Sequence, residues 1–247
     1  MPFDRPRANG SFPFILSLSK HEATIYGKMM SFREYYDRLI EMLATEDNAT
    51  EIMHAKIDFW KATGKMHGDE PSFESRMAAF FDWYLFDKKV NGVTPLEAYL
   101  AEGSEEFEIG REIYRDFLNN IHSIFIVKKI ASNGITVMDL FTRLDYSLNT
   151  ADDSTGFYRG VVFEGRILPY RGGLYLSPAL CFHPKGSRRI IKHLFKMVRK
   201  AGDTEILPLI HRLAYMNLKW ETYRNIKVRD IYKFEEYRNV RWWNLWL

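Results

Sequence analysis

Apolar residues recur with a period near 3.6 over the first half of the chain, from about residue 31. This spacing predicts helices over 31–43, 48–63 and 73–86. The third is aromatic on most sides, so we expect it to lie centrally. Thr94-Pro95-Leu96-Glu97 has the spacing of a capping box with Pro at the first helical position, and Ser104 precedes a further periodic stretch to Leu118. Two more helices are therefore expected there.

The period changes at about residue 122. Ile124–Ile130 is apolar and β-branched, and Asn133-Gly134 is typical of a hairpin whose two turn residues both have positive φ. Glu164-Gly165 and Gly172-Gly173 then separate short apolar runs, which we interpret as turns between strands. The pattern predicts a small antiparallel β-sheet or partly closed barrel over 122–182.

Helical spacing returns at Ser187 and continues to Gly202, and another helix is expected over Ile206–Arg224, broken early by Pro208. The predicted fold class is α+β, with a helical N-terminal region, the sheet in the middle and C-terminal helices. The predicted organisation is an extension, a helical region, the β unit, basic helices and a Trp-rich tail, at 1–29, 30–121, 122–182, 183–235 and 236–247 respectively.

Composition narrows the class of protein without naming a reaction. Hydrophobic residues make up 46% and charged residues 27% of 247, which excludes a disordered chain. The single cysteine permits no intrachain disulfide, so a reducing, cytoplasmic location is expected. No apolar run approaches the roughly 20 residues of a membrane span.

Charge is distributed unevenly along the chain. The whole chain carries a formal net charge of +3, but residues 183–247 hold 15 Lys and Arg against 6 Asp and Glu, a net of +9. The first 182 residues therefore hold 20 against 26, a net of −6. A basic end on an acidic body favours an anionic partner or self-contact.

The helix predicted from Ser187 concentrates this charge on one face. At 100° per residue, six cations fall within about a third of its circumference, and no acidic residue interrupts them. These residues are Arg188, Arg189, Lys192, Lys196, Arg199 and Lys200. One interpretation is a surface that binds nucleic acid, a nucleotide or an acidic partner. The other is a solvated helix face that the acidic half of the same protein partly neutralises.

Few residues suggest catalysis. The seven His residues form no HxxxH or HExxH pair, and no GxSxG, Walker A or strand-linked GxGxxG is present. Cys181 lies in an apolar stretch and is interpreted as a buried small residue. Asp82 and Asp87, five apart on one helix, do not share a face, and Asp82 is expected to be a structural acceptor. No catalytic residue, metal or cofactor is predicted.

Two further groups of residues suggest contacts. Arg159, Arg166 and Arg171 belong to the predicted sheet, where they either line a ligand groove or lie exposed. Trp242, Trp243 and Trp246 cluster near the C-terminus. An exposed patch of this kind is typical of an oligomer or partner interface, whereas a tail that folds back would bury it in the protein's own core.

Several segments resemble a family of uncharacterised bacterial proteins, chiefly from deltaproteobacteria and predatory relatives. They are the stretch Phe73–Asp87 with Thr94–Glu97, the Phe182-His183-Pro184 sequence before the basic helix, and Leu218–Arg224. The resemblance covers about residues 31–235. It implies a cytoplasmic bacterial protein and no activity.

Three hypotheses of function follow. The first is a non-enzymatic binding or regulatory protein that acts through protein–protein contacts or self-association. The second is a module that binds nucleic acid or a nucleotide through the basic helix over 187–201. The third is an enzyme whose site is assembled from residues far apart in the sequence.

Overall fold

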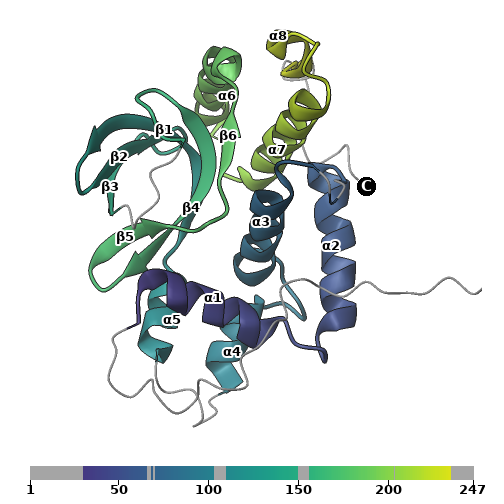
Figure 1. Cartoon of the computed structure of the whole chain (residues 1–247), viewed down its shortest axis with the longest axis vertical. Coiled ribbons are helices and arrows are strands. Elements are labelled where there is room, and N and C mark those ends of the chain that lie inside the picture. Colours follow the sequence, from purple (N-terminus) through teal and green to yellow (C-terminus); the bar gives the residue numbers. More distant parts are fainter. Residues whose placement is uncertain are drawn as a thin grey trace, which may run out of the picture. The chain divides into compact units, whose positions relative to one another are not determined.

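The computed structural model describes residues 30–65, 68, 70–102, 110–149, 156–202 and 204–234. The N-terminal extension and the tail with Trp242, Trp243 and Trp246 lie outside these residues. Among the described residues, five α-helices precede the sheet in the chain (Figure 1). They are α1 (Phe32–Leu43), α2 (Ala49–Thr63), α3 (Phe73–Phe86), α4 (Pro95–Glu102) and α5 (Arg111–Phe117).

The local sequence explains most of these helix boundaries. α2 ends before Gly64, whose φ is +89°, and α4 begins at a capping box. There the Thr94 amide donates to Glu97 Oε2 at 2.7 Å, and the Glu97 amide donates to Thr94 Oγ1 at 3.3 Å. The expected start of α5 at Ser104 falls outside the described residues. The described helix begins after Gly110, whose φ of +105° breaks the helical path.

The middle of the chain forms a curled, six-stranded antiparallel half-barrel, which confirms the predicted sheet. Its path is β3-β2-β1-β4-β5, and β6 pairs with β4. The strands are β1 (Ile121–Ala131), β2 (Gly134–Asp139), β3 (Asp145–Asn149), β4 (Val162–Tyr170), β5 (Gly173–Leu176) and β6 (Cys181–His183).

Two turns lie elsewhere than the sequence predicted. β1 and β2 form the expected hairpin, but Ala131 pairs with Gly134, so the loop is Ser132-Asn133 and neither Asn133 nor Gly134 has positive φ. Gly134 is needed because a Cβ there would overlap the Leu148 carbonyl oxygen of β3. Glu164-Gly165 is not a turn at all. Both residues are buried inside the continuous strand β4.

The C-terminal helices cover one face of the sheet. They are the short 3₁₀ turn η3 (Lys185–Ser187), α6 (Arg188–Ala201), α7 (Leu207–Thr222) and α8 (Val228–Ile231). Pro208 lies in the first turn of α7, where its missing amide leaves no hydrogen bond unmade, so it begins this helix instead of breaking it.

Alternation along β1 divides the core in two. Ile124 and Ile126 pack with α6, α7 and Tyr232, whereas Phe125 and Val127 pack with β2, β4 and Leu148 inside the curl. At the lower end of the sheet in Figure 1, α5 contacts β4. Beside the sheet, α3 contacts α2, and α2 packs along α7. α6 thus lies at the outer surface, and α3 lies between α2 and the sheet.

Candidate functional site

The sequence builds α6 as an amphipathic helix held by its apolar side. Ile191, Leu194, Phe195 and Val198 are buried in the core cluster with β1, β4 and α7. Gly202 ends the helix at φ +70°. Because four buried side chains fix its rotation, the opposite face of α6 is held toward solvent.

That opposite face carries the predicted cations. Five of the six are exposed: Arg188, Arg189, Lys192, Lys196 and Lys200. Arg199 is half-buried and donates a hydrogen bond to the carbonyl oxygen of Leu140. Burial, together with the neighbouring Arg143, lowers the pKa of Arg199. Within the described residues, no Asp or Glu lies within 4.0 Å of any of the six cationic groups.

The positive surface continues from α6 onto the sheet. The Arg188 guanidinium lies against Gly160, which follows Arg159. Arg159 lines a shallow groove with Lys128, Lys129 and Ile130 of β1. Lys128 is partly neutralised, because its Nζ lies 2.6 Å from Asp145 Oδ2.

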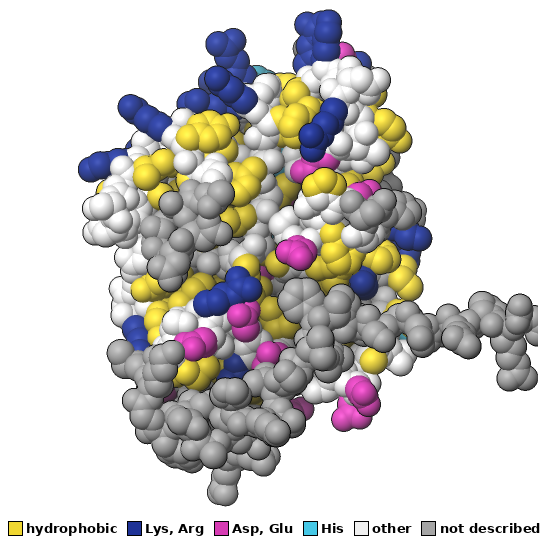
Figure 2. All heavy atoms as spheres, viewed as in Figure 1, with side chains coloured by type: hydrophobic (Ala, Val, Ile, Leu, Met, Phe, Trp, Pro, Cys, Tyr) yellow, Lys and Arg dark blue, Asp and Glu magenta, His cyan; other side chains and the backbone are white. Residues whose placement is uncertain are grey.

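We call this the basic surface: the six α6 cations with Arg143, Arg159, Lys128 and Lys129. Figure 2 shows Lys and Arg side chains gathered along the top of the drawn face, over and beside α6, whereas most of the visible Asp and Glu side chains lie lower. Tyr158, which precedes Arg159 in the chain, is 49% exposed. The surface therefore combines cations with an exposed aromatic ring.

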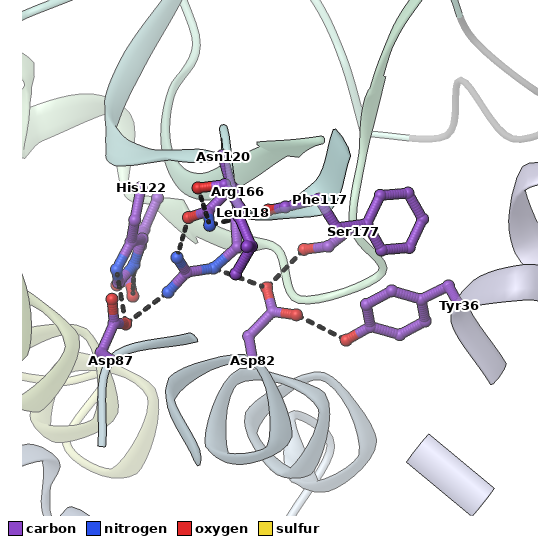
Figure 3. A network of polar contacts seen from close by, with 10 residues as sticks. Tyr36, Asp82, Asp87, Phe117, Leu118, Asn120, His122, Arg166 and Ser177 are labelled. Carbon is purple, nitrogen blue, oxygen red and sulfur yellow. Dashed lines mark hydrogen bonds and ion pairs between the residues drawn. The ribbon is translucent and has the colours of Figure 1, made fainter. Parts of the chain in front are cut away.

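A second group of charges is buried between α3 and the sheet (Figure 3). Its centre is Arg166 of β4, which is 1% exposed and not on the surface, contrary to the commoner expectation for a sheet arginine. The guanidinium donates to Asn120 Oδ1 and Asp87 Oδ2, and its Nε lies 3.6 Å from Asp82 Oδ2. Asp82 and Asp87, which were not expected to act together, thus share one cation.

Asp82 also accepts two short hydrogen bonds. Tyr36 Oη of α1 donates to Oδ1 at 2.5 Å, and Ser177 Oγ donates to Oδ2 at 2.5 Å. Burial raises the pKa of Asp82, and Arg166 and the two hydroxyls only partly offset this. The expectation that Asp82 is a structural acceptor fits this geometry, which ties α1, α3 and the sheet together.

His122 of β1 extends the cluster toward a cavity. Its Nε2 lies 3.2 Å from Glu164 Oε1, and its Nδ1 lies 3.4 Å from Asp87 Oδ2. Burial and Arg166 oppose a charged ring, but the two carboxylates raise the pKa of His122. Burial likewise opposes a charged Asp87, yet Arg166 and His122 lower its pKa to about 2. The imidazole is therefore placed to be cationic between two anions.

Sequence reasoning missed most of this cluster. From the sequence, Arg166 is only one of three arginines in the predicted sheet, and no local pattern indicates Tyr36, His122 and Glu164 as its neighbours. The one local sign was a Glu and an Arg inside an otherwise apolar run, which the adjacent glycine made resemble a turn. Within the described residues, no group of three or more His, Cys, Asp or Glu is placed to hold a metal ion.

Comparison with known families gives one match. A family model described as a family of unknown function (DUF7986) matches residues 31–206. The chain belongs to this family. The DUF7986 match spans α1 to α6, so it includes both the α6 cations and the Arg166 cluster.

This result confirms the coarser part of the sequence-based resemblance, namely membership of a family without an assigned activity. The bacterial origin that the resemblance implied stays a prediction. No curated protein and no solved structure matches the chain. Among the described helices, none is both long and apolar enough to cross a membrane.

Proposed function

We propose that this protein is a nucleic-acid-binding protein whose basic surface contacts the phosphate backbone. The observation that supports this most directly is the lack of any acidic partner within 4.0 Å of the α6 cations in the described part of the chain. Like charges four residues apart on a helix repel by a few tenths of a kcal/mol per pair. A bound polyanion would convert that repulsion into attraction.

The dimensions of the surface suit a run of phosphates. From Arg188 to Lys200 the helix rises about 18 Å at roughly 1.5 Å per residue. One strand of a duplex carries a phosphate about every 3.4 Å along its axis, so about five phosphates span that length. The groove beside Arg159 and the exposed Tyr158 extend the contact onto the sheet.

A protein partner remains the alternative outcome. The hypothesis of contacts through Trp242, Trp243 and Trp246 concerns residues outside the described part of the chain, so no geometry supports it. An acidic protein would meet the same α6 cations, but it would not show the linear salt dependence that counterion release from a nucleic acid produces. The described surface therefore favours nucleic acid.

The test is binding of the full-length protein to fluorescently labelled 20-nucleotide single-stranded and duplex oligonucleotides, followed by anisotropy across a series of salt concentrations. We expect the logarithm of affinity to fall linearly with the logarithm of salt, because each phosphate contact releases condensed counterions. The variant R189Q/K192Q/K196Q should bind more weakly at low salt and lose about 0.9 of slope per removed duplex contact.

The matched control is R33Q/K61Q/R115Q, which removes an equal number of positive charges from exposed positions on α1, α2 and α5. We expect this control to bind nearly as the unaltered protein does. Equal losses in both triple variants would attribute binding to net charge alone. Affinity that does not change with salt, or no binding at low salt, would contradict the proposal.

A further inference from the structure

A separate cavity of about 580 Å³ lies between α3, α7 and β6, and Glu164, the partner of His122, lines it. This volume falls within the range of about 300–1,000 Å³ that small-molecule sites occupy. Much of its wall is apolar, and several charged side chains line it as well. The apolar lining includes Phe59, Leu180, Phe182 and Leu218.

Two buried carboxylate oxygens in this wall lack a hydrogen-bond donor among the described residues. Glu164 is 7% exposed. His122 contacts its Oε1, and its Oε2 has no hydrogen-bond partner among the residues described. In the part of the chain that the structure describes, Glu70 Oε2 is also buried without a partner. Glu221, the third carboxylate in the lining, differs because Ser72 and Asn217 donate to its two oxygens. A ligand with several N–H donors would satisfy the first two carboxylates.

The wall also contains a buried guanidinium group that has no carboxylate partner among the described residues. Arg76 of α3 is 6% exposed, and its two terminal nitrogens donate only to backbone carbonyls, with Nη2 2.7 Å from the Thr63 oxygen. Its Nε has no hydrogen-bond partner, and among the described residues no carboxylate lies within 4.0 Å of the guanidinium. A buried cation without an anion is costly, and a ligand carboxylate would compensate it.

We propose that this cavity binds a free α-amino acid with an apolar side chain. The ammonium group would donate to Glu164 and Glu70, the carboxylate would accept from Arg76, and the side chain would occupy the apolar lining. The ammonium group of such a ligand would pair with the unsatisfied carboxylates, and its carboxylate would pair with the unsatisfied guanidinium. This site is distinct from the basic surface, and the proposal does not depend on nucleic-acid binding.

Cys181 is a built-in reporter for the test. It is the only cysteine of the chain, it lines the cavity and it is half-buried. We would measure the rate at which 4,4′-dithiodipyridine modifies the full-length protein, without ligand and with leucine, isoleucine, valine, methionine, phenylalanine or tryptophan. A ligand at about ten times its Kd leaves the cavity empty about a tenth of the time, so modification should slow about tenfold.

Recognition of the ammonium and carboxylate groups is tested by altering the ligand, so this test does not depend on the folding of a protein variant. The N-acetyl derivative of the best amino acid loses its ammonium group, and the methyl ester loses its carboxylate. We expect each derivative to protect Cys181 at least tenfold less well at equal concentration. The variant E164Q should weaken binding of the parent amino acid, whereas E112Q, at an exposed position on α5, should not.

Two results would overturn the proposal. The first is that none of the amino acids slows the modification of Cys181. The second is that the ester and the N-acetyl derivative protect as well as the parent, which would show an apolar cavity without recognition of either charged end. Neither result would affect the anisotropy experiment on the basic surface, so the two proposals fail separately.

Discussion

The basic face of α6 and the cluster around Arg166 contain the same kinds of charged side chain in opposite surroundings. Five of the α6 cations are exposed and have no acidic partner among the described residues. Arg166 is buried, and Asp82, Asp87 and Asn120 surround its guanidinium. Water stabilises the first group, whereas only other residues stabilise the second.

This difference separates the part of the molecule that maintains the fold from the part available to a partner. A buried charge costs several kcal/mol of desolvation, which its partners must offset. Removing one partner therefore destabilises the fold, because the remaining buried charge is no longer compensated. An exposed cation contributes about 0–1 kcal/mol to stability even when it is paired. We therefore expect substitutions in the Arg166 cluster to change stability and substitutions on α6 to change binding.

The largest effect is expected from Arg166→Met. The variant keeps a long apolar side chain but leaves the buried Asp82 and the half-buried Asp87 without their shared cation. We expect a loss of about 3–5 kcal/mol in the free energy of unfolding, the range for breaking a buried ion pair from one side. Urea denaturation followed by circular dichroism measures it. Arg159→Met, at an exposed position just before β4, is the control and should stay within about 0.5 kcal/mol.

A loss below about 1 kcal/mol in Arg166→Met would contradict the burial of this cluster. Asp82 offers an internal check, because its pKa is raised by burial even beside Arg166. Without Arg166, Asp82 should become still easier to protonate. The variant should then recover part of its stability as the pH falls through the range in which Asp82 takes up a proton.

Next in size is a pH effect at His183 of β6. Its ring is 3% exposed, Nδ1 lies 3.0 Å from Tyr232 Oη, and Nε2 has no hydrogen-bond partner. Burial lowers the pKa of His183 to about 4 in the folded state, against 6.5 ordinarily. Between these values the unfolded chain binds the extra proton, so the contribution of His183 to stability falls by about 3 kcal/mol as the pH drops from 6.5 to 4.

The measurement is the unfolding free energy of the unaltered protein and of His183→Gln at several pH values from 7 to 4. The variant should lose less stability over this interval, although it is less stable at pH 7. His54→Gln on α2, where the ring is exposed, is the control and should follow the unaltered protein. Parallel curves for all three proteins would exclude His183 as the titrating group.

A smaller effect is expected from Tyr36→Phe. The substitution removes the hydroxyl that donates to Asp82 Oδ1 at 2.5 Å and leaves the ring, which is fully buried. Asp82 keeps Ser177 and Arg166, so the loss should be about 1.5–3 kcal/mol, the range for a hydrogen bond to a charged group. The control is Tyr223→Phe, at an exposed position, which should leave the free energy of unfolding almost unchanged. Equal losses in the two variants would mean that the short hydrogen bond to Asp82 contributes no stability.

The same two regions also show what a sequence can and cannot predict. The cations of α6 were predictable because a helix places residues one, four and eight apart on a known face. The Arg166 cluster joins Tyr36, Asp82, His122 and Glu164 from four separate elements, and no local pattern specifies which distant residues meet. Asp82 and Asp87 illustrate the point, because their spacing on α3 argued against a common role.

The sheet was predictable in kind but not in its turns. Gly165 and Gly134 were both assigned to turns, since glycine is common there. In the structure both lie within strands, where a Cβ would meet neighbouring chain: the Leu148 carbonyl oxygen at Gly134, and Leu180 and the Phe163 ring at Gly165. Whether a glycine is needed for a turn or for close packing depends on the neighbouring strand, which sequence alone does not supply.

The smallest effect on stability is expected on α6 itself. Lys192, Lys196 and Arg189 are exposed and have no acidic partner in the described chain, so R189Q/K192Q/K196Q should change the free energy of unfolding by less than about 0.5 kcal/mol per site. Removing their mutual repulsion should, if anything, stabilise the helix slightly. Urea denaturation at low and high salt measures both the change in the free energy of unfolding and the part of it that comes from repulsion. Salt screens the repulsion in the unaltered protein, whereas the variant no longer has these charges to screen.

A marked destabilisation of this triple variant would mean that these cations are matched by anions of the same protein after all. The comparison between the two regions would then fail, because α6 would belong with Arg166 among the residues that hold the fold. Unchanged stability together with weakened oligonucleotide binding would instead separate the two roles within one protein. The surface charges would then be retained for a partner, at a small cost to the isolated chain.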